Sequence, residues 1–395
     1  MPQTGLMTTH RVSPASPASA AARFPLRLQM SSARALPSLR KPTFVKIAQI
    51  APLYESVPPK LYGGTERVVA SLCDALVDLG HDVTLFSSAD ARTKARLVAL
   101  RDQAIRLDDS GAPSSDVAAH LVLLHEVRRQ ASHFDVLHFH LDLLHLPLFE
   151  QLAEKCVTTL HGRLDIKDLP AVFDCWPTHG LVSISNHQRR PVPNAKWLAT
   201  VPHGLPAGQF TFNPSPAGEY FAFLGRISPE KGPETAIRLA IRAGVPLKIA
   251  AKVDDVDKAY FKTVIEPLLE HPLIEFIGEI GEAHKSQFLG NARGLLFPIR
   301  WPEPFGLVLI EAMACGTPVI AYRCGAVPEI IQQGVSGFII KSPEQAINAM
   351  GRIDCLDRRA VRCEFERRFT AQHMACAYVD VYAGLIDSRR FARAS

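Results

Sequence analysis

Long apolar runs are missing from this sequence of 395 residues. A membrane-spanning helix needs roughly 18 to 20 consecutive apolar residues, and the longest candidates here are interrupted by charged residues or proline. We therefore expect no integral membrane segment, whereas peripheral contact with a membrane surface stays open. Hydrophobic residues make up 47% of the chain and charged residues 21%, a balance typical of a globular protein with a sizeable core.

Closely spaced cysteine pairs are missing as well. None of the eight cysteines stands in a C-x-x-C pair, and their surroundings in the sequence are mostly apolar. This pattern indicates reduced core cysteines in a reducing compartment, and a disulfide framework is not expected in a chain of this length. The predicted location is the cytoplasm, and the oligomeric state is not predicted.

Acidic residues are absent from the segment 1–42, which contains six basic residues. These are Arg11, Arg23, Arg27, Arg34, Arg40 and Lys41. Without them the net charge of +5 becomes about −1, so the sequence does not favour a nucleic-acid partner. The segment lacks helical or strand periodicity, and we expect a disordered leader that can be deleted without loss of function. A start codon assigned too early and an organelle transit peptide stay open, whereas the missing apolar core argues against a secretory signal.

Short apolar runs alternate with helix-like stretches after Pro42, which is typical of parallel sheets covered on both faces. In the first half, strands are predicted at 44–50, 82–86, 134–139, 157–160, 181–184 and 197–201. Val68 begins a helical pattern that Gly80 ends. Periodicity is lost at 202–218, where a linker is expected. In the second half, strands are predicted at 220–224, 247–251, 274–277, 294–297, 318–322 and 337–340, with helices beginning near Pro233, Lys258, Ala283, Gly306 and Pro328.

The fold class that follows is α/β, with two doubly wound units in one chain. In such sheets, ligands bind beyond the carboxyl ends of the strands. The cleft between the two units is therefore the expected site.

Two glutamates mark the most informative string, which spans residues 301–320. Glu303 and Glu311 are separated by seven residues. Pro304 should keep Glu303 extended and outside the following helix, whereas Glu311 should lie on that helix. Carboxylates accept hydrogen bonds from sugar and ribose hydroxyls. The alternative is two surface acids that flank the start of a helix.

Groups suited to a diphosphate occur at two places. Gly306 allows close approach to the backbone, and the N–H groups of Gly306 and Leu307 should be free at a helix N-terminus. The loop 223–233 carries Arg226 and Lys231, which together can neutralise a diphosphate without a metal. A solvated basic loop is the alternative interpretation.

A doubled glycine follows the first predicted strand, in Tyr62-Gly-Gly-Thr-Glu-Arg. The N–H groups of Gly63 and Gly64 could approach phosphates, although a plain turn explains such a pair equally well. The string is not G-x-G-x-x-G, so a dinucleotide-binding fold is not supported.

Four histidines lie at or near predicted strand ends. They are His138, His140, His145 and His161. A metal site is disfavoured because their spacing includes no H-x-x-x-H or C-x-x-C pattern. His161 ends a strand, and both a structural role and a role in the site stay open.

The string 301–320, the loop 223–233 and the Gly63-Gly64 pair resemble the retaining, GT-B-fold glycosyltransferases of the group 1 (family 4) type. That family includes sucrose, trehalose and bacterial glycogen synthases. The resemblance covers residues 44–385. It implies a GT-B fold of two Rossmann-like domains and transfer of a hexosyl group with retention at the anomeric carbon.

Roles for individual residues also follow from the resemblance. It implies that Glu303 contacts the donor sugar, Glu311 the ribose, Arg226 and Lys231 the diphosphate, and His161 the sugar near the reacting carbon. The implied catalytic residues are Glu303, His161, Arg226 and Lys231. The implied donor-binding residues are Gly63, Gly64, Arg226, Lys231, Glu303, Phe305, Gly306, Leu307 and Glu311. The string His203-Gly-Leu-Pro departs from the Asn-Gly-Val-Asp that is common before the second domain, which weakens any role for an Asp there.

The implied layout places an acceptor-side domain at 43–206 and a donor domain at 207–370. The C-terminal helix, 371–395, should return to the first domain. The segments 87–133 and 161–180 are expected to be loops that select the acceptor.

The expected donor is a nucleotide-diphosphate sugar, with UDP-glucose first, and no metal or other cofactor is expected. The acceptor is not identified. A nucleotide-sugar epimerase on the same fold and a non-catalytic sugar-binding protein are the alternatives.

Overall fold

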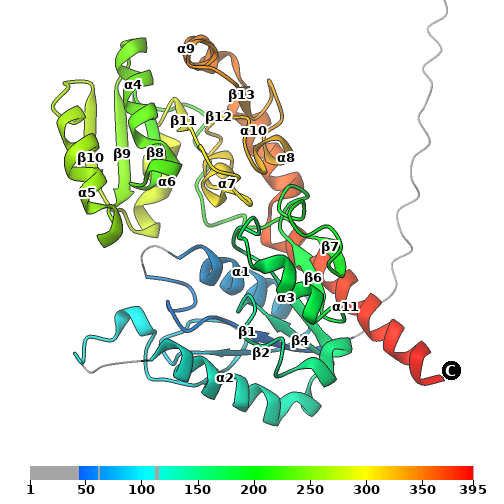
Figure 1. The fold of residues 1–395 in the computed structure, drawn as a ribbon. Helices are drawn as coiled ribbons and strands as arrows, with labels where there is room; N and C mark the ends of the chain where they lie inside the picture. The colour runs from blue at the N-terminus through cyan, green and yellow to red at the C-terminus, as the bar shows by residue number, and fades with distance from the viewer. Residues whose placement is uncertain (1–43, 61–62, 112–114, 395) are drawn as a thin grey trace, which may run out of the picture. The chain divides into compact units, whose positions relative to one another are not determined.

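The computed structural model of the protein describes residues 44–60, 63–111 and 115–394 (Figure 1). The predicted leader 1–42 lies outside the described residues, as does Tyr62 of the glycine motif. Within the described ranges, no helix is both long and apolar enough to cross a membrane.

Seven parallel strands of the described chain form a first sheet, in the order β3-β2-β1-β4-β5-β6-β7. The strands are β1 (Lys46–Ile50), β2 (Asp82–Ser87), β3 (Arg96–Ala99), β4 (Val136–Phe139), β5 (Cys156–Thr159), β6 (Gly180–Ser183) and β7 (Trp197–Thr200); the helices are α1 (Gly64–Asp78), α2 (Asp116–Gln130) and α3 (Leu169–Cys175). Ile47 packs in the apolar cluster of α1 and Ala48 in that of α2. Because successive strand residues point to opposite faces, α1 and α2 cover the two faces of this sheet (Figure 1).

A second sheet contains six further described strands, in the order β10-β9-β8-β11-β12-β13. They are β8 (Phe221–Arg226), β9 (Leu247–Lys252), β10 (Ile274–Gly278), β11 (Gly294–Phe297), β12 (Val319–Tyr322) and β13 (Gly337–Ile340). The accompanying helices are α4 (Pro233–Ala243), α5 (Lys258–Tyr260), α6 (Glu282–Gly290), α7 (Leu307–Ala314), α8 (Val327–Ile330), α9 (Pro343–Arg352) and α10 (Arg358–Arg368), and α11 (Ala371–Ala394) follows them in the chain. The two doubly wound α/β units predicted from the sequence are thereby confirmed, and every predicted strand lies within two residues of its observed ends.

Two segments that were predicted to be loops contain regular structure. The loop prediction is therefore wrong for both. The segment 87–133 contains β3 and α2, and the segment 161–180 contains α3. In α2 the buried residues, such as Leu123 and Val127, follow helical spacing, but Val117, Leu121 and Val122 on its exposed side are apolar too. Apolar residues on both sides hide the helical period in the sequence.

The last helix, α11, packs against α1. Tyr378 and Tyr382 of α11 are fully buried in the same apolar cluster as Val68 and Leu72 of α1. At its start, Ala371 N–H donates to the carbonyl oxygen of Leu205 over 2.8 Å. These contacts bring the C-terminal segment to the first sheet.

The cysteines are all free, but only part of the prediction about them holds. Cys73, Cys156 and Cys315 are buried, as expected for core residues. Four others are exposed, namely Cys175, Cys355, Cys363 and Cys376. Helical residues near an apolar stripe can point away from it, and the composition of a run does not reveal this.

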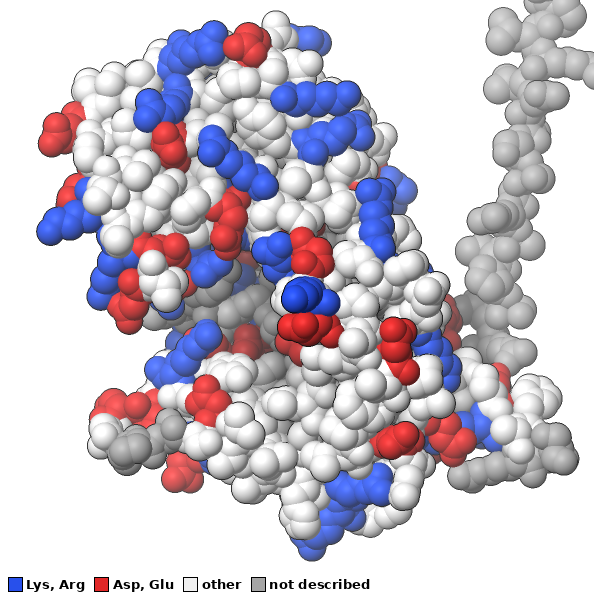
Figure 2. Space-filling view, viewed as in Figure 1, with Lys and Arg blue, Asp and Glu red and all other residues white. Residues whose placement is uncertain are grey.

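Charges of both signs are mixed on the surface. On the face that Figure 2 shows, Lys and Arg side chains lie interspersed with Asp and Glu side chains. This distribution agrees with the near-neutral charge of the chain after Pro42.

Arg358 ties α10 to the second sheet. Its guanidinium donates to the carbonyl oxygens of Asn213, Ala292 and Gly290 and to the Thr317 hydroxyl, over 2.7 to 3.0 Å. The side chain is 9% exposed, and burial lowers its pKa to about 10. A planar fork with several donors satisfies these acceptors in a way that a lysine ammonium cannot.

We expect Arg358→Lys to lower the free energy of unfolding by about 2–4 kcal/mol, because buried carbonyl groups lose their donors. Urea unfolding measures this change. Arg359→Lys, on the exposed neighbour, is the control and should stay within about 0.5 kcal/mol of the parent. Equal effects of the two substitutions would contradict this account of Arg358.

Candidate functional site

The candidate site lies at the same topological position in both sheets, where the strand order reverses. In the first sheet the strand order reverses between β1 and β4, and in the second between β8 and β11. Ligands of doubly wound sheets bind at such points, beyond the carboxyl ends of the strands. A cavity of about 350 Å³ lies there, and its wall includes residues from both sheets. Its size lies within the usual range for ligand pockets.

Every residue that the sequence analysis assigned to the site lines this cavity. They are Gly63, Gly64, His161, Arg226, Lys231, Glu303, Phe305, Gly306, Leu307 and Glu311. The structure therefore brings together residues that lie as far apart in the sequence as Gly63 and Glu311. The role of each remains a prediction.

Glu303 is held by its backbone in the loop after β11. The N–H of Ala326 donates to the Glu303 carbonyl oxygen over 2.9 Å. Gly325 has a φ of +56°, and a Cβ there would lie 2.3 Å from the same oxygen. Glycine is thus required at this contact. Gly325 was not predicted from the sequence, in which only its place in the string Cys-Gly-Ala-Val-Pro indicates a tight turn.

The Glu303 carboxylate already has two donors. Lys231 Nζ lies 2.5 Å from its Oε2, and Trp301 Nε1 donates to the same oxygen over 3.1 Å. The turn at Gly232, with a φ of +72°, passes so close to the Pro298 carbonyl that a Cβ would lie 2.3 Å from its oxygen. This close passage fixes the backbone next to Lys231.

Arg226 is the last residue of β8, and its side chain lies between two carboxylates. Its guanidinium contacts Asp254 and Glu230, each over 3.1 Å. Lys252 also binds Asp254, over 3.0 Å, so two cations share this carboxylate. The side of the cavity formed by β8 and β9 is therefore rich in ion pairs.

Two helices begin at the wall of the cavity. Gly306, with a φ of +91°, is the N-cap of α7, and Gly63 is the N-cap of α1. No side chain of the described residues caps either helix. A Cβ on Gly64 would lie 3.6 Å from Leu307, so the two helix starts are close together. First-turn N–H groups without an internal partner are available to an anion.

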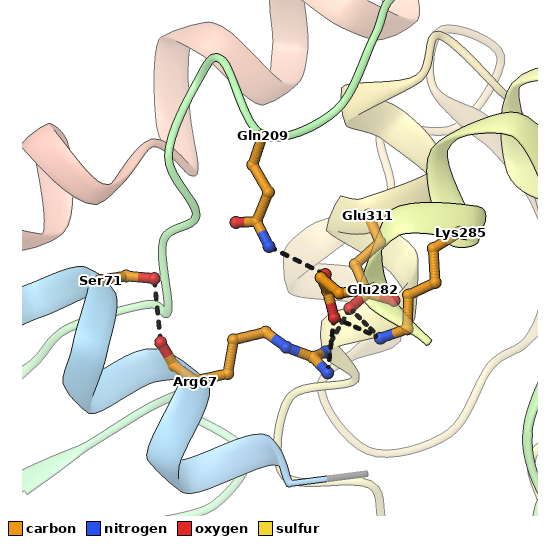
Figure 3. Close-up of polar contacts among 6 residues, drawn as sticks. All are labelled: Arg67, Ser71, Gln209, Glu282, Lys285 and Glu311. Atoms are coloured by element: carbon orange, nitrogen blue, oxygen red, sulfur yellow. Dashed lines mark hydrogen bonds and ion pairs between the residues drawn. The ribbon is translucent and has the colours of Figure 1, made fainter. Parts of the chain in front are cut away.

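Glu311 is buried between two cations (Figure 3). Arg67 Nη1 lies 2.6 Å and Lys285 Nζ 3.2 Å from its Oε1, and the residue is only 2% exposed. Both cations also contact Glu282, which accepts a hydrogen bond from Gln209. Burial alone would raise the Glu311 pKa, but the two cations outweigh it and hold that pKa below its ordinary value.

The cations Arg67 and Lys285 have no role in the sequence analysis. Arg67 closes the glycine motif and stands one turn into α1, three residues after Gly64. That spacing puts both residues on the same side of the helix, a signal that was available. Lys285 follows Glu282 by three residues on α6, which alone indicates only a surface ion pair.

The histidines form a buried group beside the cavity. His161 Nε2 lies 2.8 Å from His140 Nδ1, and the ring of His161 stacks on His203 with centroids 5.1 Å apart. Burial lowers the pKa of His161 to about 3, and the pKa values of His140 and His203 lie well below the ordinary value for the same main reason. These rings are therefore neutral at physiological pH.

No set of three His, Cys, Asp or Glu side chains in the described ranges is grouped to hold a metal ion. His138 instead bonds to Tyr382 and Thr159, and His145 to Thr158. Metal independence stays a prediction.

The fold and the site define a protein of GT-B architecture, with a cavity that faces both Rossmann-like units. The family model described as "Glycosyltransferase Family 4" matches residues 62–200, and that of "Glycosyl transferases group 1" matches residues 210–357. Together these matches span more than half of the sequence. The chain belongs to the group 1 glycosyltransferase family.

Individual relatives are more distant. The chain is 30% identical over 202 residues to a D-inositol 3-phosphate glycosyltransferase of Streptomyces griseus, covering 44% of this chain and 40% of that protein. It is 26% identical over 359 residues to a phosphatidyl-myo-inositol mannosyltransferase of Mycolicibacterium smegmatis, covering 82% and 88%. Among solved structures, Anabaena Alr3699/HepE in complex with UDP and glucose matches with a TM-score of 0.66 and 17% identity, over 86% of this chain and 100% of that one. The match to the D-inositol 3-phosphate glycosyltransferases thus spans about two fifths of their length.

The neutral histidines predict how stability depends on pH. An unfolded histidine titrates near pH 6.5, so below that pH the unfolded chain binds more protons than the folded one. The contribution of these neutral rings to the free energy of unfolding is therefore fully present above pH 6.5. It is lost as the pH falls below that value, by about 1.4 kcal/mol per pH unit for each such histidine.

We expect His140→Gln to reduce this slope between pH 6 and pH 5 by the contribution of one proton. Urea unfolding at several pH values measures it. His125→Gln, at an exposed position of α2, is the control and should leave the slope unchanged. An unchanged slope for His140→Gln would show that this ring is protonated in the folded protein.

Proposed function

We propose that the protein is a retaining glycosyltransferase that moves a hexosyl group from a nucleotide-diphosphate sugar to an acceptor hydroxyl. One observation carries the proposal: a single cavity joins two uncapped helix starts and the Arg226–Lys231 pair with Glu303, Glu311 and His161. This set offers a binding group for each part of a nucleotide sugar.

The diphosphate is proposed to bind between Arg226, Lys231 and the N-terminus of α7. Lys231 already lies 2.5 Å from a carboxylate oxygen of Glu303, a distance typical of a strong charge-assisted contact. Phosphate oxygens can share these cations with their present carboxylate partners. Backbone N–H groups at Gly306 and Leu307 add donors without any side-chain movement.

Glu311 is proposed to accept hydrogen bonds from the ribose hydroxyls. Arg67 and Lys285 keep its carboxylate ionised, so it has only acceptors to offer. They leave further lone pairs on the carboxylate for a ligand, because each carboxylate has about four acceptor positions. This proposal makes Arg67 and Lys285 the residues that orient Glu311.

The reaction follows from this arrangement. The acceptor oxygen bonds to the anomeric carbon on the face that the diphosphate leaves, while the bond from that carbon to the diphosphate oxygen breaks. A diphosphate oxygen takes the acceptor proton, and the nucleoside diphosphate departs. Arg226, Lys231 and the α7 N-terminus stabilise the charge that develops on the leaving group, and Glu303 the cationic sugar.

UDP-glucose is the proposed donor. A structural neighbour is described with UDP and glucose, whereas a relative aligned over most of its length is a mannosyltransferase, so GDP-mannose is the competing donor. The names of two relatives contain inositol, which makes inositol phosphates and phosphatidylinositol the acceptors to screen first. An epimerase would convert the donor without any acceptor, and a sugar-binding protein would leave it intact.

We expect UDP to bind with the same Kd in the presence and absence of EDTA, because the proposed diphosphate site uses cationic side chains and backbone N–H groups. Lys231→Ala should weaken UDP binding roughly tenfold or more, the loss of one charge-assisted contact. Isothermal titration calorimetry measures both effects. Lys258→Ala, which removes an exposed lysine of the same half, is the control. Loss of both UDP and GDP binding on chelation would contradict the metal-independent site.

Substitutions of Glu303 and Glu311 should change different kinetic and binding constants. Glu303→Gln removes a negative charge next to a centre that becomes cationic, so kcat should fall about 100-fold with UDP affinity unchanged. Glu311→Gln should mainly raise the donor KM and weaken UDP binding. Steady-state kinetics and calorimetry on the same preparations separate the two effects.

Glu282→Gln is the matched control for Glu311→Gln. Glu282 contacts the same two cations but does not line the cavity, so UDP affinity should stay close to that of the parent. Weakening by Glu303→Gln rather than by Glu311→Gln would reverse the assigned roles.

A further inference from the structure

A chain of buried hydrogen bonds connects α11 to the cavity wall. It runs from the Tyr382 hydroxyl to Gln49 of β1 over 3.1 Å, from Gln49 to His140 over 2.9 Å, and from His140 to His161 over 2.8 Å. Tyr382 and Gln49 are fully buried, and His140 is 2% exposed. Tyr382 of α11 is thus linked to His161 through two other side chains.

The amide of Gln49 gives this chain a direction. Its Nε2 donates to the Tyr382 oxygen, so its Oε1 must accept from His140 Nε2–H. A neutral imidazole has one donor and one acceptor nitrogen, so His140 Nδ1 accepts. The donor to His140 Nδ1 is then His161 Nε2–H. The remaining nitrogen of His161, Nδ1, carries no proton.

A second branch agrees with this direction. The Tyr382 hydroxyl accepts from Gln49, so its own proton is free to go to His138 Nδ1, 2.8 Å away. His138 Nε2–H then donates to the Thr159 hydroxyl over 2.7 Å, and this hydroxyl also bonds to Tyr378. One arrangement of protons therefore satisfies both branches, with every ring neutral.

The bare Nδ1 of His161 has no hydrogen-bond partner among the described residues, although it is buried. A buried acceptor without a donor costs about 1–3 kcal/mol. His161 lines the same cavity as Glu303, which is proposed to contact the donor sugar. A sugar hydroxyl is a donor of the required kind.

We propose that Tyr382, Gln49 and His140 are positioning residues that hold His161 in its Nε2–H tautomer, so that Nδ1 accepts a hydrogen bond from a donor-sugar hydroxyl. The proposal rests on the proposed function and specifies the sugar end of that site. His161 then acts as an acceptor and not as a proton donor to the leaving diphosphate. Burial, which lowers the pKa of each ring, agrees with this assignment.

The tautomer can be measured without any substrate. Long-range ¹H–¹⁵N correlation spectra of the ¹⁵N-histidine-labelled protein distinguish protonated from bare ring nitrogens, and the signals lost in His161→Gln identify His161. We expect a protonated Nε2 and a bare Nδ1. A protonated Nδ1, or a rapidly exchanging mixture of tautomers, would overturn the proposal whatever the activity of the enzyme.

Two tyrosines one turn apart on α11 supply the matched variants. Tyr382→Phe removes the hydroxyl that orients Gln49, so His161 should become a mixture of tautomers, and kcat should fall about two- to tenfold, as for one lost neutral hydrogen bond. UDP affinity should not change. Tyr378→Phe, which touches only the second branch, should keep the tautomer and the kcat. If Tyr382→Phe leaves the tautomer unchanged, Tyr382 does not position His161.

A titration with donor separates this proposal from the proposed function. UDP-glucose or GDP-mannose should shift the His161 Nδ1 signal, and UDP alone should not. Binding of the nucleotide sugars without such a shift would refute the sugar contact while the glycosyltransferase proposal stands. Failure of all nucleotides to bind, with the predicted tautomer present, would refute the proposed function and with it the sugar contact.

Discussion

The buried carboxylate of Glu311 constrains much of the site. A charge that is only 2% exposed needs partners of opposite charge, and here Arg67 of α1 and Lys285 of α6 supply them. The ion pairs therefore tie a helix of the first unit to two helices of the second. Because α1 and α7 both begin at the cavity wall, the pairing that satisfies Glu311 also sets the distance between their N-termini.

Elsewhere in the cavity wall, charged side chains are also held by polar or oppositely charged partners. Lys231 and Trp301 hold Glu303, while Asp254 and Glu230 hold Arg226. Each cation that is proposed to bind the diphosphate is thus held by a carboxylate. On the proposed function, a nucleotide sugar shares these partners, and the side chains are in place before any phosphate contact forms. Such preorganisation reduces the cost of ordering the side chains on binding.

The sequence predicts most strands of the two sheets because inner strands such as β4 and β11 are buried on both faces and stand out as apolar runs, and it misses the edge strand β3, whose end residues are exposed. It predicts that Glu303 lies outside α7 because Pro304 disfavours a helical conformation for the residue before it. It fails for α2, whose exposed apolar residues conceal its period, and for Gly325, whose requirement comes from a loop 22 residues away in sequence. The Gln49–His140–His161 chain is also invisible in the sequence, since strand register and the return of α11 create it.

The most direct test of the account is the configuration of the product. With UDP-glucose and an accepted acceptor, proton NMR of the new glycosidic bond distinguishes the α from the β anomer. The account predicts the α configuration of the donor in the product, because the acceptor attacks from the side of the leaving diphosphate. A β-linked product would contradict front-face transfer at this site.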